Sequence, residues 1–136
     1  SLDLNDEKNN TDCINCSNDL DWKFIATVKK SVEDNMDNPS FNVDVLCNLL
    51  NMSRTSFYNK IKALTDQAPA DYIRLIRLKH AAQLLKEQKH TITEISELTG
   101  FSDAKYFREV FKKHFNMSPS QYAKRGKEGK DDKEIK

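Results

Sequence analysis

One stretch decides the fold: Leu46-Cys47-Asn48-Leu49-Leu50-Asn51-Met52-Ser53, which recurs in altered form as Ile95-Ser96-Glu97-Leu98-Thr99-Gly100-Phe101-Ser102. Each copy is followed by two apolar residues four positions apart, then by a proline and a tyrosine: Phe57, Ile61, Pro69 and Tyr72 after the first, and Phe107, Phe111, Pro119 and Tyr122 after the second. The offset is 49 residues up to Ser53/Ser102 and 50 from Phe57/Phe107 onward, as though Asp103 had been inserted. Such a repeat indicates one supersecondary unit used twice.

The composition indicates one mostly helical domain. The chain has 136 residues with only three Gly and three Pro, and no alternating run of Val, Ile and Thr suggests a strand. No apolar run approaches the roughly 20 residues that span a bilayer, so we expect no membrane contact by this segment. Because the chain starts with Ser1 rather than Met, we expect it to be a piece of a longer protein.

The three cysteines are too few for a disulfide framework. This favours a cytoplasmic location and leaves open an inner-membrane anchor elsewhere in the parent protein. Cys13 and Cys16 form a Cys-x-x-Cys pair, but neither a second pair nor a nearby His completes a zinc site. We therefore expect no bound metal and no cofactor. Cys47 lies on an apolar helix face and is predicted to be a small core residue.

The net charge of +1 conceals an uneven distribution. Residues 1–44 carry four Lys and Arg against ten Asp and Glu, a net −6, whereas residues 45–127 carry fifteen against seven, a net +8. A basic repeat region is suited to neutralising phosphates. We predict an acidic disordered linker from an upstream domain over 1–18, a folded domain over 19–125, and a mobile charged tail over 126–136.

Helical periodicity and cap residues predict an all-α fold of seven helices, arranged as two helix-turn-helix subdomains joined by a long linker helix. The first helix is expected to begin at Asp19 or Asp21. Asn42 caps the second helix, which is expected to turn four apolar side chains inward: Val45, Leu46, Leu49 and Leu50.

The other helices follow from the same kinds of signal. Ser53 caps a helix over 53–64, and Pro69 starts the linker helix. The spacing of Thr91 and Glu94 is that of a capping box, and Gly100 ends the helix that this box opens, where the chain must reverse. A helix over 103–115 follows, and a short last helix begins at Ser118-Pro119.

This arrangement favours binding to double-stranded DNA, because the first helix of a helix-turn-helix supports a second whose outer face enters a major groove. Burial of Phe57 and Ile61 leaves five residues of the helix 53–64 outside: Arg54, Thr55, Tyr58, Asn59 and Lys62. Burial of Phe107 and Phe111 likewise leaves five residues of the helix 103–115 outside: Ala104, Lys105, Arg108, Glu109 and Lys112. Most of these side chains can hydrogen-bond to base edges. Ser53 and Ser102 mark helix starts, whose backbone N–H groups suit phosphate.

The length of the linker helix also fits DNA. A helix over 69–88 would be about 30 Å long, and successive major grooves on one face of a duplex lie about 34 Å apart. One chain is therefore expected to place both recognition helices in adjacent major grooves without dimerising.

Two runs of residues resemble the DNA-binding domain of the AraC/XylS family. The first comprises Met52-Ser53-Arg54 through Lys60-Ile61-Lys62 and then Pro69-x-x-Tyr72-Ile73-Arg74-x-x-Arg77-Leu78. The second is Gly100-Phe101-Ser102-Asp103-x-x-Tyr106-Phe107 with Phe111-Lys112-Lys113 and Ser118-Pro119-x-x-Tyr122. The resemblance covers about residues 40–125 and implies a seven-helix, non-enzymatic, sequence-specific transcription regulator that works with RNA polymerase. One departure is Asn51, where the family often has Gly, but Asn tolerates the left-handed conformation.

The resemblance also assigns roles to residues. It implies that Arg77 ties the linker helix to its surroundings. Base contacts are predicted for Thr55, Tyr58, Asn59, Ala104, Lys105, Arg108 and Glu109. Phosphate contacts are predicted for Ser53, Arg54, Lys62, Ser102, Lys112 and Lys113.

The flanking sequence narrows the expected context. The start Asp21-Trp22-x-Phe24 and the acidic linker look like the output end of hybrid two-component proteins of Bacteroides-like bacteria, in which a sensor, a histidine kinase and a response-regulator receiver precede this module in one phosphorelay. Any kinase activity and any dimerisation would then belong to upstream domains. One alternative is a stand-alone AraC-type regulator with a small-molecule sensing domain. Another is a helical protein-interaction module, which predicts a broad exposed apolar stripe.

An enzymatic role for this segment is the weakest alternative. His80, His90 and His114 lie far apart in the sequence, without a matched carboxylate or thiol, and no Gly-rich phosphate loop is present.

Overall fold

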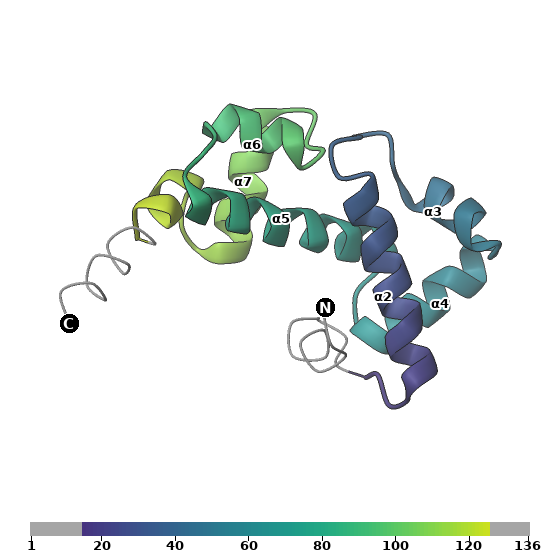
Figure 1. Ribbon diagram of the computed structural model, residues 1–136. Coiled ribbons are helices and arrows are strands. Elements are labelled where there is room, and N and C mark those ends of the chain that lie inside the picture. The colour runs from purple at the N-terminus through teal and green to yellow at the C-terminus, as the bar shows by residue number, and fades with distance from the viewer. Residues whose placement is uncertain (1–14, 126–136) are drawn as a thin grey trace. The chain divides into compact units, whose positions relative to one another are not determined.

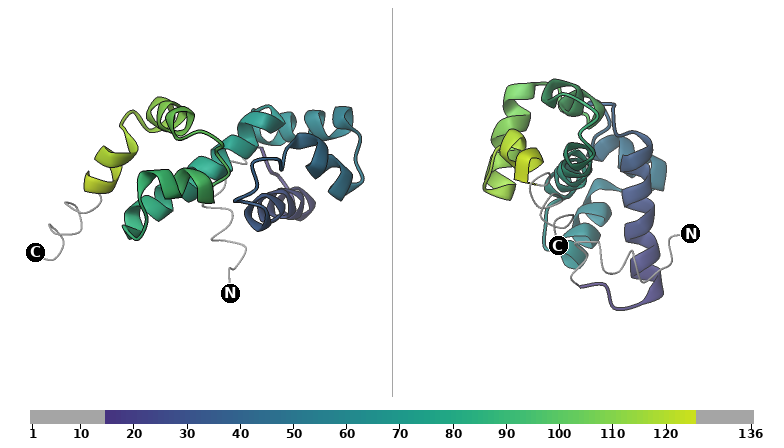
Figure 2. Two further views of the ribbon diagram at one scale, coloured as in Figure 1. Left: turned by 90° about the horizontal axis from the view of Figure 1, so that it is seen from above. Right: turned by 60° about the vertical axis from the view of Figure 1, so that its left-hand side comes forward.

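The computed structural model describes residues 15–125, and this part of the chain is helical without any strand (Figures 1 and 2). Six helices are α2 (Asp19–Asp34), α3 (Val43–Leu50), α4 (Arg54–Thr65), α5 (Pro69–Glu87), α6 (Ile92–Leu98) and α7 (Ala104–Phe115). Residues 119–125 form a seventh helical segment. The predicted all-α fold is confirmed. The predicted linker over 1–14 and tail over 126–136 lie outside the described residues.

The described chain divides into two compact units. The first unit comprises residues 15–35 and 41–76, and the second comprises residues 36–40 and 77–125. Each unit contains one helix-turn-helix, formed by α3 and α4 in the first and by α6 and α7 in the second. The continuous helix α5 contributes residues to both units (Figure 1).

The core of the first unit is built from apolar residues that recur at helical spacing in α2 and in the two helices that follow. Ile25, Val28 and Val32 are fully buried, and so are Leu46, Phe57 and Ile61. The prediction for α3 is wrong at two positions, because Val45 is 39% exposed and Leu49 is 58% exposed. Six of the eight residues of α3 are apolar, so periodicity alone does not choose its inner face. The buried residues of α3 are Leu46 and Cys47, both of which were predicted to lie in the core.

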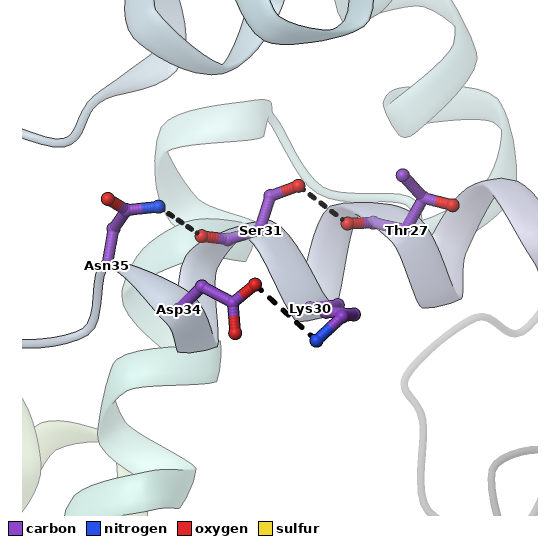
Figure 3. A network of polar contacts seen from close by, with 5 residues as sticks. All are labelled: Thr27, Lys30, Ser31, Asp34 and Asn35. Carbon is purple, nitrogen blue, oxygen red and sulfur yellow. Dashed lines mark hydrogen bonds and ion pairs between the residues drawn. The ribbon is translucent and has the colours of Figure 1, made fainter.

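Polar side chains bond back onto the helix at the C-terminal half of α2 (Figure 3). Ser31 Oγ donates to the Thr27 carbonyl at 2.9 Å, and Asn35 Nδ2 donates to the Ser31 carbonyl at 2.8 Å. Lys30 Nζ lies 3.5 Å from Asp34 Oδ2. The Asn35 bond satisfies one of the last carbonyls of α2, which the end of a helix leaves without a backbone donor. The Ser31 bond reaches a carbonyl inside the helix, a common local contact of serine.

Asn15 extends the first unit beyond its predicted boundary. Its backbone N–H donates to the Leu64 carbonyl at 3.0 Å, and its Nδ2 donates to the Ala63 carbonyl at 2.9 Å. The predicted linker over 1–18 is therefore too long at its C-terminal end. Residues 15–18 are described in the structure, and Asn18 caps α2. Two carbonyls near the C-terminal end of α4 supply the acceptors, a contact across 48 residues that no local pattern encodes.

The second unit has a core of aromatic and aliphatic residues: Leu78, Ala81, Ala82, Leu85, Ile95, Phe101, Phe107 and Phe111. Phe107 lies between Phe101 and Phe111, with ring centroids 5.1 and 5.7 Å away. Tyr122 from the last helical segment meets the Phe111 ring edge-on at 5.4 Å. Edge-on and tilted aromatic pairs add stability beyond burial of their area, so this cluster fixes α7 within its unit.

Arg77 is almost fully buried in the second unit, with 6% of its surface exposed. Its Nη1 donates to the carbonyls of Met36 and Thr99 at 2.6 and 2.8 Å, and its Nη2 donates to the Asn38 carbonyl at 3.0 Å. Burial lowers the pKa of Arg77 from its ordinary value. The inferred role of Arg77 in tying α5 to its surroundings is confirmed.

Cys47 is the buried free thiol of the first unit, as predicted. Burial raises the pKa of this thiol, and the Asp44 carboxylate raises it further, while Arg54 opposes the shift. Cys16 is disulfide-bonded, and Cys13 lies outside the described residues. In residues 15–125, no helix has the length and apolar character needed to cross a bilayer, and no cluster of His, Cys, Asp and Glu is suited to hold a metal ion.

Candidate nucleic-acid interface

The first recognition helix, α4, presents a polar stripe to solvent. Phe57 and Ile61 are buried on one face, which leaves Thr55, Tyr58, Asn59 and Lys62 exposed on the other. These four positions have the spacing i, i+3, i+4 and i+7, so they form one ridge along the helix. Tyr58 is 48% exposed although it is aromatic. We call these four residues the α4 stripe.

The second recognition helix, α7, presents residues at the same relative positions. Burial of Phe107 and Phe111 leaves a ridge that we call the α7 stripe: Lys105, Arg108, Glu109 and Lys112. Of the thirteen predicted contact residues, all are exposed except Ala104, which is half-buried at the first position of α7. Each unit thus brings its predicted residues together at one surface.

The turn before each recognition helix has the predicted backbone. Asn51 adopts the left-handed conformation with φ of 54°, and Gly100 has φ of 80°. The capping box at Thr91 and Glu94 is confirmed, with Glu94 Oε1 accepting from the Thr91 N–H at 2.8 Å. This hydrogen bond from the Thr91 backbone, together with a hydrogen bond from the Thr91 side chain, holds the pKa of Glu94 below its ordinary value.

The start of α7 differs from the start of α4. Ser53 caps α4 through its hydroxyl, which accepts from the Ser56 N–H at 3.1 Å. In α7 the cap is Asp103, whose Oδ1 accepts from the Lys105 N–H at 3.0 Å, and Ser102 stands one residue outside. The expectation that Ser102 marks the helix start is corrected, because the inserted Asp103 supplies the capping oxygen. Its carboxylate also places a negative charge where a phosphate was expected.

Two predicted phosphate-contacting cations of the first unit have partners within the chain. Arg54 Nε lies 3.0 Å from Asp44 Oδ1, which joins the start of α4 to α3. Lys62 Nζ donates to the Asp66 carbonyl at 3.2 Å, at the C-terminal end of its own helix. Neither contact was anticipated from the sequence.

Tyr106 is an exposed residue of α7 that the predicted contact set omits. It is 43% exposed, and its ring is tilted against Phe101 with centroids 6.2 Å apart. It directly precedes the buried Phe107 in the sequence. One step along a helix turns the side chain by about 100°, which carries Tyr106 from the core to the flank of the α7 stripe.

Two helix-turn-helix units with exposed polar second helices define a class of protein, the helical DNA-binding domains. The family described as "Helix-turn-helix domain" matches residues 46–125. The chain belongs to this family and contains a helix-turn-helix DNA-binding domain of the AraC type.

Several known proteins are similar to this chain in sequence and in fold. The chain is 46% identical over 106 residues to Histidine kinase P4 of Formosa agariphila, across 78% of this chain and 8% of that protein. It is similar to the C-terminal domain of the two-component response regulator yesN from Fusobacterium nucleatum, with a TM-score of 0.67 and 27% identity, covering 74% of this chain and 98% of that one. It is also similar to the DNA-binding domain of AdpA, solved in complex with a target DNA, with a TM-score of 0.66 and 25% identity, covering 73% and 88%. The chain thus spans less than a tenth of the matched histidine kinase.

Proposed function

We propose that this domain is the output module of a two-component phosphorelay protein and regulates transcription by placing α4 and α7 in adjacent major grooves. The observation that carries the proposal is the pair of exposed polar stripes at equivalent positions of the two recognition helices. The phosphorelay context is supported by the similarity to a histidine kinase and to the C-terminal domain of a response regulator. Any histidine kinase activity then belongs to other parts of the parent protein.

The proposed interface uses side chains suited to the two parts of a duplex. Base contacts are proposed for Thr55, Tyr58, Asn59, Ala104, Lys105, Arg108 and Glu109. Phosphate contacts are proposed for Ser53, Arg54, Lys62, Ser102, Lys112 and Lys113. Arg and Lys pair with guanine, Asn pairs with adenine, and Glu accepts from cytosine. Phosphate contacts hold the domain in register without reading sequence.

The length of α5 is compatible with two adjacent grooves. Its 19 residues, Pro69–Glu87, correspond to about 28 Å at 1.5 Å per residue. We propose that RNA polymerase is the partner at the promoter, that dimerisation occurs through upstream domains, and that the module acts in the cytoplasm, where the DNA lies.

Selection of random duplexes by the full 136-residue chain tests the proposal. We expect an enriched site with two short elements about one helical turn apart. Tyr58→Ala should relax sequence preference in only one element and Arg108→Ala in only the other, with each lost contact reducing discrimination by about 1–3 kcal/mol. Lys30→Gln, an exposed change on α2, serves as the control. Equal loss at both elements from each substitution would refute the assignment.

A further inference from the structure

The α4 and α7 stripes match position by position but differ in charge. At the repeat offset of 50 residues, three neutral residues of α4 correspond to three ionised residues of α7: Thr55 to Lys105, Tyr58 to Arg108, and Asn59 to Glu109. At the fourth position both helices carry a lysine, Lys62 and Lys112. The α7 stripe therefore holds three cations and one carboxylate, whereas the α4 stripe holds a single cation.

The cations of α4 all have partners inside the first unit. Arg54 pairs with Asp44 at 3.0 Å, and Lys62 donates to the Asp66 carbonyl at 3.2 Å. The third cation, Lys60, lies off the stripe, with its Nζ 4.3 Å from the centroid of the Phe24 ring. A lysine over an aromatic face is held there by the ring quadrupole.

The cations of α7 have no such partners. Lys105, Arg108, Lys112 and Lys113 are exposed, and within residues 15–125 none of their side chains forms an ion pair or a hydrogen bond. Glu109 is also unpaired in this part of the chain, so its charge does not fix any one of these cations in place.

This difference has a physical consequence for binding to a polyanion. Each phosphate neutralised by a free cation releases counterions, and the logarithm of the binding constant then falls by about 0.9 per contact for each tenfold increase in salt. The exposed Arg54–Asp44 pair breaks at little cost. However, Asp44 stays beside Arg54, and its charge offsets the attraction of the arginine to phosphate. Neutral Thr, Tyr and Asn side chains contact bases without releasing counterions.

We propose a division of labour between the two recognition helices, which rests on the DNA-binding function proposed above. The α7 stripe contacts bases through Lys105, Arg108 and Glu109, and its three cations also supply most of the salt-dependent affinity. The α4 stripe contributes base discrimination that depends little on salt. Asp44 acts as a positioning residue whose charge weakens the proposed contact of Arg54 with the phosphates.

Titration of a fluorescent duplex carrying the selected site, at salt concentrations from 50 to 200 mM, tests this division with two lysines at equivalent positions. Lys112→Gln should lower the salt slope by about 0.9, which means that its affinity falls about 3.5-fold less than that of the wild type across this range. Lys62→Gln should lower the slope by less than about a third of that amount. Equal reductions from the two substitutions would overturn the proposal.

A third substitution predicts a gain rather than a loss. Asp44→Asn removes the carboxylate beside Arg54 and should raise the salt slope by up to about 0.9 and tighten binding at 50 mM salt. Asp44→Asn combined with Arg54→Gln should return the slope to the wild-type value. Provided that thermal melting shows every variant to be folded, an unchanged slope in Asp44→Asn would contradict the weakening of the Arg54 contact by Asp44.

The same titration separates the two proposals. If the wild-type chain binds no duplex, the proposed function fails, and the division of labour fails with it. If the wild type selects a two-element site but Lys62 and Lys112 contribute equally, only the division of labour fails.

Discussion

Substitution of Gly100 by alanine tests how the second helix-turn-helix is held. Gly100 has φ of 80°, and an added Cβ would overlap Arg77 Nη1 and lie 2.6 Å from the Met36 carbonyl oxygen. The buried guanidinium of Arg77 must therefore move, because the Met36 carbonyl is backbone and cannot easily give way. The displaced Nη1 is the atom that donates to Met36 and Thr99.

The expected cost combines two effects. An alanine in the left-handed region costs about 1–2 kcal/mol. Loss or distortion of hydrogen bonds from a charged donor costs about 1.5–3 kcal/mol each, partly recovered if the guanidinium finds other acceptors. We expect Gly100→Ala to lower the free energy of unfolding by about 3–5 kcal/mol. That is a large share of the 5–15 kcal/mol typical of a domain.

Asn51→Ala provides a matched control, because Asn51 has φ of 54° but is exposed at the equivalent turn of the first unit. This substitution meets only the conformational cost and should lower stability by about 1–2 kcal/mol. Urea unfolding followed by far-UV circular dichroism measures the whole chain, while the single tryptophan, Trp22, reports on the first unit. Equal losses in Gly100→Ala and Asn51→Ala would refute the crowding by Arg77.

Three further predictions concern individual contacts. The pKa of Glu94 is lowered in the folded state, so its carboxylate stabilises the fold at a pH above the ordinary glutamate pKa of about 4.3. This contribution disappears as the pH falls through the lower pKa of the folded state. The stability difference between the wild type and Glu94→Gln, measured by urea unfolding, should therefore shrink as the pH is lowered from about 6 to about 3. Thr65→Val should cost about 2 kcal/mol in thermal unfolding, because the buried hydroxyl donates to Ile61 at 2.8 Å and accepts from the Gln67 N–H at 3.1 Å. Asn15→Ala should cost about 0.5–1 kcal/mol in the same assay, because its bond to the Ala63 carbonyl is exposed.

Each of these predictions has a contrary outcome. A constant difference between wild type and Glu94→Gln across the pH range would show that the carboxylate does not act through its ionisation. Thr99→Val is the control for Thr65→Val, since the Thr99 hydroxyl donates to the Ile95 carbonyl at 2.7 Å but accepts no hydrogen bond from an N–H group within residues 15–125, and it should cost about 1 kcal/mol. A larger loss from Thr99→Val would reverse that ranking. No loss from Asn15→Ala would return the boundary of the domain to Asp19.

Local signals in the sequence predicted the helix ends well. Asn42, Ser53 and Thr91 cap their helices as expected, because a capping bond joins residues only three positions apart. The left-handed turn residues Asn51 and Gly100 were predictable for the same reason. Such bonds depend on neighbours in the chain, so a short stretch of sequence contains the information that determines them.

Contacts between distant parts of the chain were not predictable in this way. The pairing of Arg54 with Asp44 depends on how α3 packs against α4, and the bonds of Asn15 depend on where the end of α4 lies. The inner face of α3 was misjudged because Val45 and Leu49 are as apolar as the residues that the structure buries. The base and phosphate contacts remain predictions, since exposure alone makes a side chain available for DNA without assigning it a partner.

The repeated core explains why the two recognition stripes were free to diverge. Phe57 and Ile61 in α4, and Phe107 and Phe111 in α7, are buried at equivalent positions and determine which face of each helix points outward. A large-to-small change at such a buried site typically costs 2–5 kcal/mol, whereas exposed substitutions usually change stability by less than about 0.5 kcal/mol. The stripe residues can therefore change charge without threatening the fold. A duplicated scaffold of this kind can keep one geometry while its two helices acquire different binding chemistry.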